Sequence, residues 1–119
     1  MQSHLVEKFL RLSLQNLGLD YVDLYLVHWP IGFSYYGDPL LVCPKKSGKL
    51  DLDFSTNLED IWRAMENVCD KGLTRRIGLS NFNESQISRI LTTARIPPAS
   101  LQVAKEMIRI QQKYCLMTC

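Results

Sequence analysis

The sequence predicts an α/β fold with parallel strands, built from about three βα units. Along its 119 residues, apolar positions at helical spacing alternate with short apolar runs bounded by glycine and proline. One such run, residues 21–28, is mostly apolar on both faces, which is typical of a strand in a parallel sheet covered by helices. Alternating helices and strands favour parallel βαβ units with right-handed crossovers.

The first helix is predicted to end at Gly18, which can adopt a left-handed cap. Its apolar positions are Leu5, Phe9, Leu10, Leu12, Leu14 and Leu17. The strand over residues 21–28 follows, and Asp23 on its helix-facing side is expected to pair with a nearby base. Residues 31–55 hold three glycines and two prolines and are predicted to be one long loop. Such a loop is often functional, and this one directly follows His28.

The spacing of Thr56 and Glu59 predicts a capping box, in which the two side chains each satisfy a backbone N–H at a helix start. The apolar stripe of that helix is Leu58, Ile61, Trp62, Met65, Val68 and Cys69. Lys71 and Gly72 are expected to end it, because a cation and a left-handed residue both suit a helix C-terminus.

A second strand is predicted over residues 76–82, where the chain opens into a turn. Asn83, with Gln86 three residues on, is expected to cap the next helix, which two prolines at positions 97–98 stop. Residues 100–103 are expected to form a third strand, and helical spacing resumes after them.

Polar side chains are predicted at the carboxyl ends of all three strands. His28 ends the first strand, and Ser80 and Asn81 end the second. Gln102 lies near the end of the third. Sites in parallel α/β folds lie at this edge, so neighbouring strands would bring the four side chains together. A structural role stays open for each: a carbonyl-bonded histidine, turn or cap residues, and a surface glutamine.

Composition and charge exclude several function classes. A formal net charge of +2 with scattered basic residues gives no argument for nucleic acid or an anionic membrane surface as partner. No apolar run approaches the ~18 residues of a membrane span, and the amphipathic N-terminus lacks a signal-peptide cleavage site. A cytoplasmic location is therefore expected. The four cysteines have no metal-ligand spacing, which favours reduced thiols and no metal site. Rossmann, P-loop and nucleophile-elbow motifs are absent from the sequence.

Four stretches of the chain match the motifs of one known family. Residues 17–30 read LGLDYVDLYLVHWP, like a signature in which a strand ends in His-Trp-Pro. Residues 76–82 read RIGLSNF, like a second signature with Ser-Asn after the next strand. The helix between them carries the expected tryptophan and methionine stripe followed by Lys-Gly, and residues 100–103 read SLQV, like the following strand. Over roughly residues 4–103, the chain therefore resembles the aldo-keto reductases.

This resemblance implies a fold and an activity. The fold is a TIM (β/α)8 barrel, of which the chain would supply a partial barrel of about three βα units. The activity is NADPH-dependent reduction of a carbonyl small molecule to an alcohol by hydride transfer. Residues 31–55 would form a substrate-pocket loop, where Tyr35 and Tyr36 could contribute.

The resemblance also implies a role for each candidate residue. His28 is expected to orient the substrate carbonyl by hydrogen bonding, and Trp29 is expected to line the substrate pocket. Ser80, Asn81 and Gln102 are expected to hydrogen-bond the carboxamide of the nicotinamide of NADP(H). These bonds would fix which face of the ring presents its hydride.

The chain departs from the family pattern in its extent and in its last residues. A TIM barrel typically needs ~250 residues. The family's catalytic tyrosine, lysine and aspartate are expected upstream of residue 1, and its phosphate-binding basic segment is expected downstream. After residue 103 the family has Glu-x-His/Asn-Pro, whereas this chain reads AKEMIRIQQKYCLMTC. Residues 1–103 are therefore expected to be the central part of a barrel, and residues 104–119 a divergent helical tail.

Two functions of different classes stay open. The first is a reductase fragment that is inactive alone, because it lacks the proton donor and the phosphate-binding segment. The second is a non-enzymatic truncated product or interaction fragment that docks on an intact relative. The family is usually monomeric, but unpaired sheet edges would allow a fragment to self-associate. A flavodoxin-like domain is disfavoured, because HWPIGFSYYGD makes a poor phosphate-binding turn after the first strand.

Overall fold

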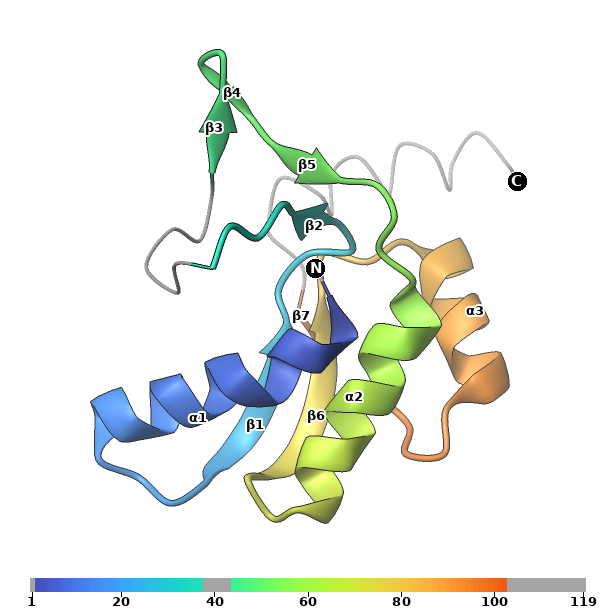
Figure 1. Cartoon of the computed structure of the whole chain (residues 1–119). Coiled ribbons are helices and arrows are strands. Elements are labelled where there is room, and N and C mark those ends of the chain that lie inside the picture. Colours follow the sequence, from blue (N-terminus) through green and yellow to red (C-terminus); the bar gives the residue numbers. More distant parts are fainter. Residues whose placement is uncertain (1, 38–43, 103–119) are drawn as a thin grey trace.

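The computed structural model describes residues 2–37 and 44–102, and its centre is a parallel three-stranded sheet with helices on one face (Figure 1). The strand order is β1–β6–β7, with bounds Val22–Val27, Thr74–Ser80 and Leu101–Gln102. The helices are η1 (Ser3–Leu5), α1 (Val6–Leu17), α2 (Leu58–Asp70) and α3 (Glu84–Thr93). The predicted α/β class with parallel strands is confirmed.

The core lies between the three α-helices, α1, α2 and α3, and the covered face of the sheet. Ile77 and Leu79 of β6 and Val27 of β1 point into it and are almost fully buried. The helices contribute Val6, Leu10, Leu14, Leu58, Ile61, Trp62, Met65, Val68 and Ile90. β6 is the central strand of the sheet, and its carboxyl half is buried in this core.

The helix ends follow the local signals in the sequence, with one shift. Gly18 caps α1 in the left-handed conformation at φ +66°, as predicted. Asn83 and Gln86 form the predicted capping box of α3. The predicted box at Thr56 is wrong, because the N-cap of α2 is Asn57, whose side chain accepts from the N–H groups of Glu59 and Asp60. The Thr56 hydroxyl instead donates to the carbonyl of Asp53.

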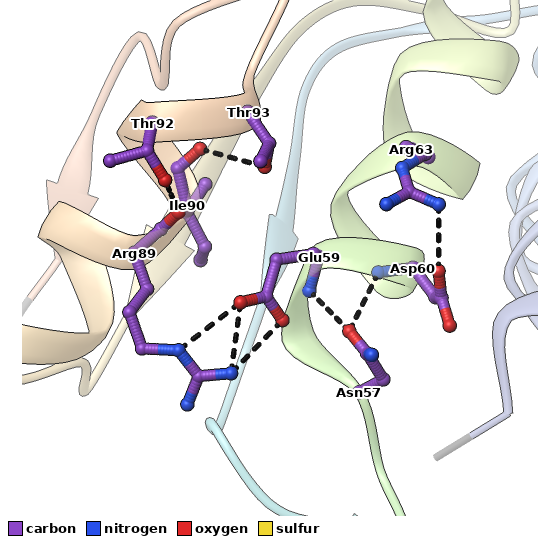
Figure 2. Close-up of polar contacts among 8 residues, drawn as sticks. All are labelled: Asn57, Glu59, Asp60, Arg63, Arg89, Ile90, Thr92 and Thr93. Carbon is purple, nitrogen blue, oxygen red and sulfur yellow. Dashed lines mark hydrogen bonds and ion pairs between the residues drawn. The ribbon is translucent and has the colours of Figure 1, made fainter.

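An exposed ion pair joins the first turn of α2 to α3. The guanidinium of Arg89 donates to both carboxylate oxygens of Glu59 at 2.8–3.1 Å (Figure 2). The helix N-terminus and this guanidinium together hold the pKa of Glu59 below its usual value. The pair contributes modestly to stability because Arg89 is largely in water.

The prediction that β1 is buried on both faces needs correction. Tyr25 and Val27 face the helices, whereas Leu24 on the other face is 41% exposed. All described helices lie on the opposite side of the sheet (Figure 1). The expected pairing of Asp23 is confirmed, because Arg75 donates to its carboxylate at 2.9 Å.

The segment 31–55 is not one structureless loop. It contains β2 (Gly32–Phe33), β3 (Lys45–Lys46), β4 (Lys49–Leu50) and β5 (Leu52–Asp53). β2 pairs antiparallel with β5, and β3 pairs antiparallel with β4. These short pairs bring the chain back to α2 directly above the carboxyl ends of β1 and β6 (Figure 1).

The expected helical tail, residues 104–119, lies outside the described residues, as does the boundary placed at residue 103. Among the residues that the structure does describe, no helix is long and apolar enough to cross a membrane.

Candidate functional site

The predicted site residues lie at one edge of the sheet. In the parallel register, Ser80 of β6 pairs with Gln102 of β7, and Val27 of β1 pairs with Leu79. His28 follows directly after Val27, so it lies at the same level as Ser80. The structure thus brings the carboxyl ends of the three strands together, while the roles of these side chains stay predictions.

Asn81 ties the three strand ends together. Its side-chain amide donates to the carbonyl of His28 at 2.9 Å and to the hydroxyl of Ser80 at 3.1 Å. Its backbone N–H donates to the carbonyl of Gln102 at 2.9 Å. One residue at the end of β6 therefore bonds to the residue that follows β1 and to the last residue of β7.

The backbone of Asn81 is left-handed, with φ +62°. This conformation is costly for most residues with a side chain, although asparagine tolerates it better than most. The residue is also 5% exposed, so the packing around it holds the conformation. Such strained positions are typical of functional sites.

The face of the sheet decides where the side chains point. Ser80 and Gln102 are register partners, and side chains alternate along a strand. They therefore share the face that carries Leu26 and Gly78, opposite to the helix-covered face of Ile77 and Leu79. Ser80 is buried and Gln102 is exposed.

The absence of a side chain at Gly78 allows neighbouring chain segments to approach this face of β6 closely. A Cβ at this position would lie 2.7 Å from Leu26 Cδ2 and 2.7 Å from the carbonyl oxygen of Ser100. The neighbouring strands thus approach β6 so closely that only glycine fits without displacement. Sequence reasoning missed this role; an isolated glycine within a predicted strand was the available signal.

The rings of His28 and Trp29 are exposed and lie beside each other. Their centroids are 5.6 Å apart and the planes are tilted by 44°. Both follow the last residue of β1, and the bond from Asn81 holds the carbonyl of His28. The backbone that carries both rings is therefore held by the residue that follows β6.

A pocket of about 430 Å³ opens beside these residues. Its lining residues come from the segment after β1, the segment before α2 and the start of α3: Trp29, Pro30, Ile31, Asp53, Phe54, Thr56, Asn81, Asn83 and Gln86. Trp29 and Asn81 are thus the predicted site residues in this pocket, whereas His28, Ser80 and Gln102 lie outside its lining. Phe54, which is 81% exposed, was missed because nothing in the sequence distinguishes it from an ordinary loop residue.

Tyr35 and Tyr36 do not line this pocket. The hydroxyl of Tyr35 accepts from Lys8 at 2.9 Å and donates to the carbonyl of Gly37 at 3.0 Å. The hydroxyl of Tyr36 donates to the carboxylate of Asp51, which raises the pKa of Tyr36. Both side chains tie the segment after β2 to its surroundings.

The donor set at the strand ends suits a carboxamide. A carboxamide presents one carbonyl acceptor and two N–H donors. A serine hydroxyl and a glutamine amide can each donate and accept, so Ser80 and Gln102 offer both kinds of partner from adjacent strands.

Comparison of this chain with known proteins identifies a matching family and several relatives. The model of the Aldo/keto reductase family matches residues 1–119. The Gallus gallus protein "Aldo-keto reductase family 1 member A1" is 50% identical over 99 residues, and its Homo sapiens counterpart is 44% identical over 98 residues. Each match covers 82% of this chain and 29% of the relative. The chain thus spans less than a third of the length of these relatives.

Solved structures agree with the sequence matches. The aldose reductase of Schistosoma japonicum superposes with a TM-score of 0.79 at 40% identity, over 94% of this chain and 38% of that chain. An aldo-keto reductase of Bombyx mori, solved in complex with NADPH, superposes with a TM-score of 0.69 at 40% identity. That match covers 86% of this chain and 27% of the silkworm chain.

Proposed function

Because the chain belongs to the aldo-keto reductase family and folds as part of a TIM barrel, we propose that it supplies part of the active site of an NADPH-dependent carbonyl reductase. The reaction is reduction of an aldehyde or ketone to an alcohol by hydride transfer. The observation that carries the proposal is the bonding of Asn81, which gathers His28, Ser80 and Gln102 at one edge of the sheet.

Ser80, Asn81 and Gln102 would hold the carboxamide of the nicotinamide. The hydroxyl of Ser80 and the amide of Gln102 share one face of the sheet and can pair with both ends of a carboxamide. Asn81 fixes the spacing of the two strands that carry them. When bound, the cofactor supplies the hydride, and the task of these residues is to orient the ring that carries it.

His28 and Trp29 would position the substrate. An imidazole N–H of His28 can donate to a carbonyl oxygen, and a bond of this kind both orients the carbonyl and polarises it. Trp29 offers an apolar wall, and the adjoining pocket continues that wall with Pro30, Ile31 and Phe54. The proposed substrate is therefore a carbonyl compound with an apolar body.

The reduction also requires a proton donor, because the carbonyl oxygen becomes negative as the hydride arrives. The tyrosines of the described residues are poorly placed for this task. Tyr25 faces the helices, and burial raises the pKa of its hydroxyl. Tyr35 and Tyr36 are bonded away from the pocket, and Tyr21 stacks on Arg75 beside the opposite end of the sheet. We therefore propose that the 119-residue polypeptide by itself does not catalyse the reduction.

Two measurements test this function. The first is NADPH oxidation by the purified chain with an aldehyde, where we expect no steady turnover. The second uses a chimera in which residues 4–102 replace the matching segment of the Gallus gallus relative. The chimera should oxidise NADPH with the aldehyde, and Asn81→Ala in it should raise the KM for NADPH. A folded but inactive chimera would contradict the proposed function, and steady turnover by the chain alone would contradict the need for another acid.

A second candidate function is docking on an intact reductase. The observation that favours it is the exposure of apolar residues on the outer strands: Leu24 of β1 is 41% exposed and Leu101 of β7 is 47% exposed. Within the described residues, each of these strands pairs on one side only. Co-purification with an intact reductase would support docking. A soluble monomer that does not bind the reductase would exclude it.

A further inference from the structure

We propose that Glu66 is a positioning residue for Gln102. Its buried carboxylate holds the loop that leads from α3 into β7, and this loop sets where Gln102 meets Ser80. The inference rests on the proposed function of Gln102 in nicotinamide binding. Its experimental test uses no cofactor, so the two can fail independently.

The contact is made by one carboxylate oxygen with two consecutive backbone groups. Oε1 of Glu66 accepts from the N–H of Arg95 at 2.7 Å and from the N–H of Ile96 at 2.8 Å. Glu66 lies on α2 and is 5% exposed. A buried carboxylate is expensive unless it is hydrogen-bonded, so these two bonds are strongly favoured over an unpaired alternative.

A neighbouring side chain of α2 bonds to the carbonyl of the same residue, Ile96. The indole Nε1–H of Trp62 donates to the carbonyl of Ile96 at 3.0 Å. Trp62 is 1% exposed. Both backbone polar groups of Ile96 are thus bonded to buried side chains of one helix, which locates this residue relative to the core.

The chain between Ile96 and β7 transmits this position. Pro97 and Pro98 follow, and each proline fixes its own φ and restricts the residue before it. Two prolines in succession leave few backbone rotations through which a shift of Ile96 could be absorbed. The next residue, Ala99, then donates to the carbonyl of Ile77 at 2.8 Å.

β7 depends on this loop because the strand itself is weak. It comprises Leu101 and Gln102 alone, and both are exposed. Its register with β6 comprises two residue pairs, and two bonds flank it: Leu79 N–H donates to the Ser100 carbonyl at 3.0 Å, and Asn81 N–H donates to the Gln102 carbonyl at 2.9 Å. A short, exposed strand of this kind takes its place from its connection as much as from its ladder.

Two other contacts between α2 and the α3 region do not hold the backbone of the loop that leads into β7. An exposed Arg89 and a partly buried Glu59 join the helices through their side chains (Figure 2), and Arg95 pairs with Asp70 at 2.6 Å with both side chains exposed. Neither pair bonds to the loop backbone. Glu59→Gln is therefore a matched control, since it weakens a contact of the same helix without touching Ile96.

The experiment is amide hydrogen exchange on the full 119-residue chain, read residue by residue by NMR. The variants are Glu66→Ala, which removes the acceptor, and Glu66→Gln, which keeps an oxygen acceptor. The amides of Leu79 and Asn81 report the β6–β7 pairing, and the amide of Val22, bonded to the Leu73 carbonyl at 3.2 Å, reports the remote end of the sheet.

Glu66→Ala should speed exchange at Leu79 and Asn81 by roughly tenfold or more, because two bonds to a charged acceptor are lost. Val22 should change much less. Glu66→Gln should restore most of the protection, and Glu59→Gln should leave Asn81 unchanged. Trp62→Phe, which removes the indole donor, should speed exchange at Asn81 in the same direction by a smaller factor.

Three results would overturn the proposal. Equal acceleration at Val22 and Asn81 would mean that Glu66 contributes to stability in general and does not position β7. Unchanged exchange at Asn81 in Glu66→Ala would mean that β7 holds its place without the loop. Failure of Glu66→Gln to restore protection would mean that the acceptor geometry is not the cause. If Glu66→Ala does not fold, Trp62→Phe decides the proposal: faster exchange at Asn81 than at Val22 supports it, and unchanged exchange at Asn81 or equal acceleration at both amides overturns it.

Discussion

Replacing Gly78 with alanine tests how closely the strands approach one another beside the candidate site. The new Cβ would lie 2.7 Å from Leu26 Cδ2 and 2.7 Å from the Ser100 carbonyl oxygen. The leucine methyl can rotate away, but the carbonyl belongs to the backbone and also accepts from Leu79 N–H at 3.0 Å. The substitution therefore forces the backbone at Ser100 to move and weakens the pairing of β7.

The expected change in the free energy of unfolding is the difference between destabilising contacts and a stabilising backbone effect. Overpacking of this kind costs about 1–3 kcal/mol, and loss of one backbone hydrogen bond costs about 1 kcal/mol. Alanine is favoured over glycine within a strand by about 0.5–1 kcal/mol, which offsets part of this loss. We expect Gly78→Ala to lower the free energy of unfolding by about 1–3 kcal/mol.

Urea unfolding followed by the fluorescence of the buried Trp62 measures this change. The double variant Leu26→Ala/Gly78→Ala separates the two close contacts. If the Ser100 carbonyl dominates, removing the leucine side chain does not rescue stability. A Gly78→Ala protein as stable as the wild type would contradict this close packing, because the strands would then have room for a side chain at this position.

Three further predictions concern the helix ends and pH. Asn57→Ala should lower the free energy of unfolding by about 1 kcal/mol and Thr56→Ala by clearly less, because Asn57 is the cap of α2; the reverse order in urea unfolding would restore the threonine box. Asn83→Ala should destabilise the protein by about 1 kcal/mol through loss of the α3 capping box, and circular dichroism melts would show an unchanged midpoint if the box were dispensable. The pKa of Glu59 is lowered in the folded state, so its contribution is full above the ordinary value of 4.5 and is lost as the pH falls through the lowered value. Arg89→Ala should reduce this acid-side loss in urea titrations at a series of pH values, and an identical pH dependence in both proteins would contradict the assignment.

Local sequence signals predicted the elements of this fold well. Gly18, which must be left-handed, and the paired Asn83 and Gln86 each define a helix end without help from distant residues. The cap of α2 was misplaced because Thr56 and Asn57 both suit the position, and both are followed three residues later by an acidic residue. The choice is made by tertiary structure, since the Thr56 hydroxyl donates to the Asp53 carbonyl and so points away from the helix.

The position of the candidate residues at one edge of the sheet was predicted, their roles stay predictions, and the construction of the site around them was not predicted. The alternation of strands and helices, together with the family motifs, placed His28, Ser80 and Gln102 at one edge. The roles of Gly78 and Glu66 could not be predicted in this way. Glu66 occupies a position that reads as one more polar residue of an amphipathic helix, and its partners lie 29 and 30 residues further along the chain.

The burial of β1 shows a different limit. The apolar pattern of Leu24 and Leu26 predicted a strand buried on both faces, but within the described residues Leu24 is 41% exposed and Leu26 is only partly buried. The apolar residues of β1 suit burial on both faces of the strand. Within the described residues, helices cover only one of these faces.

Nicotinamide recognition at the strand ends is tested most directly by an NMR titration of the 119-residue chain with nicotinamide mononucleotide, which carries the nicotinamide without the adenosine phosphates. We expect chemical-shift changes concentrated at Ser80, Asn81 and Gln102, and their loss in Asn81→Ala. Adenosine 2′,5′-bisphosphate, which lacks the nicotinamide, should leave these residues unchanged. Shifts confined to other surfaces, or equal shifts with the adenosine ligand, would contradict the claim that these strand ends recognise the nicotinamide.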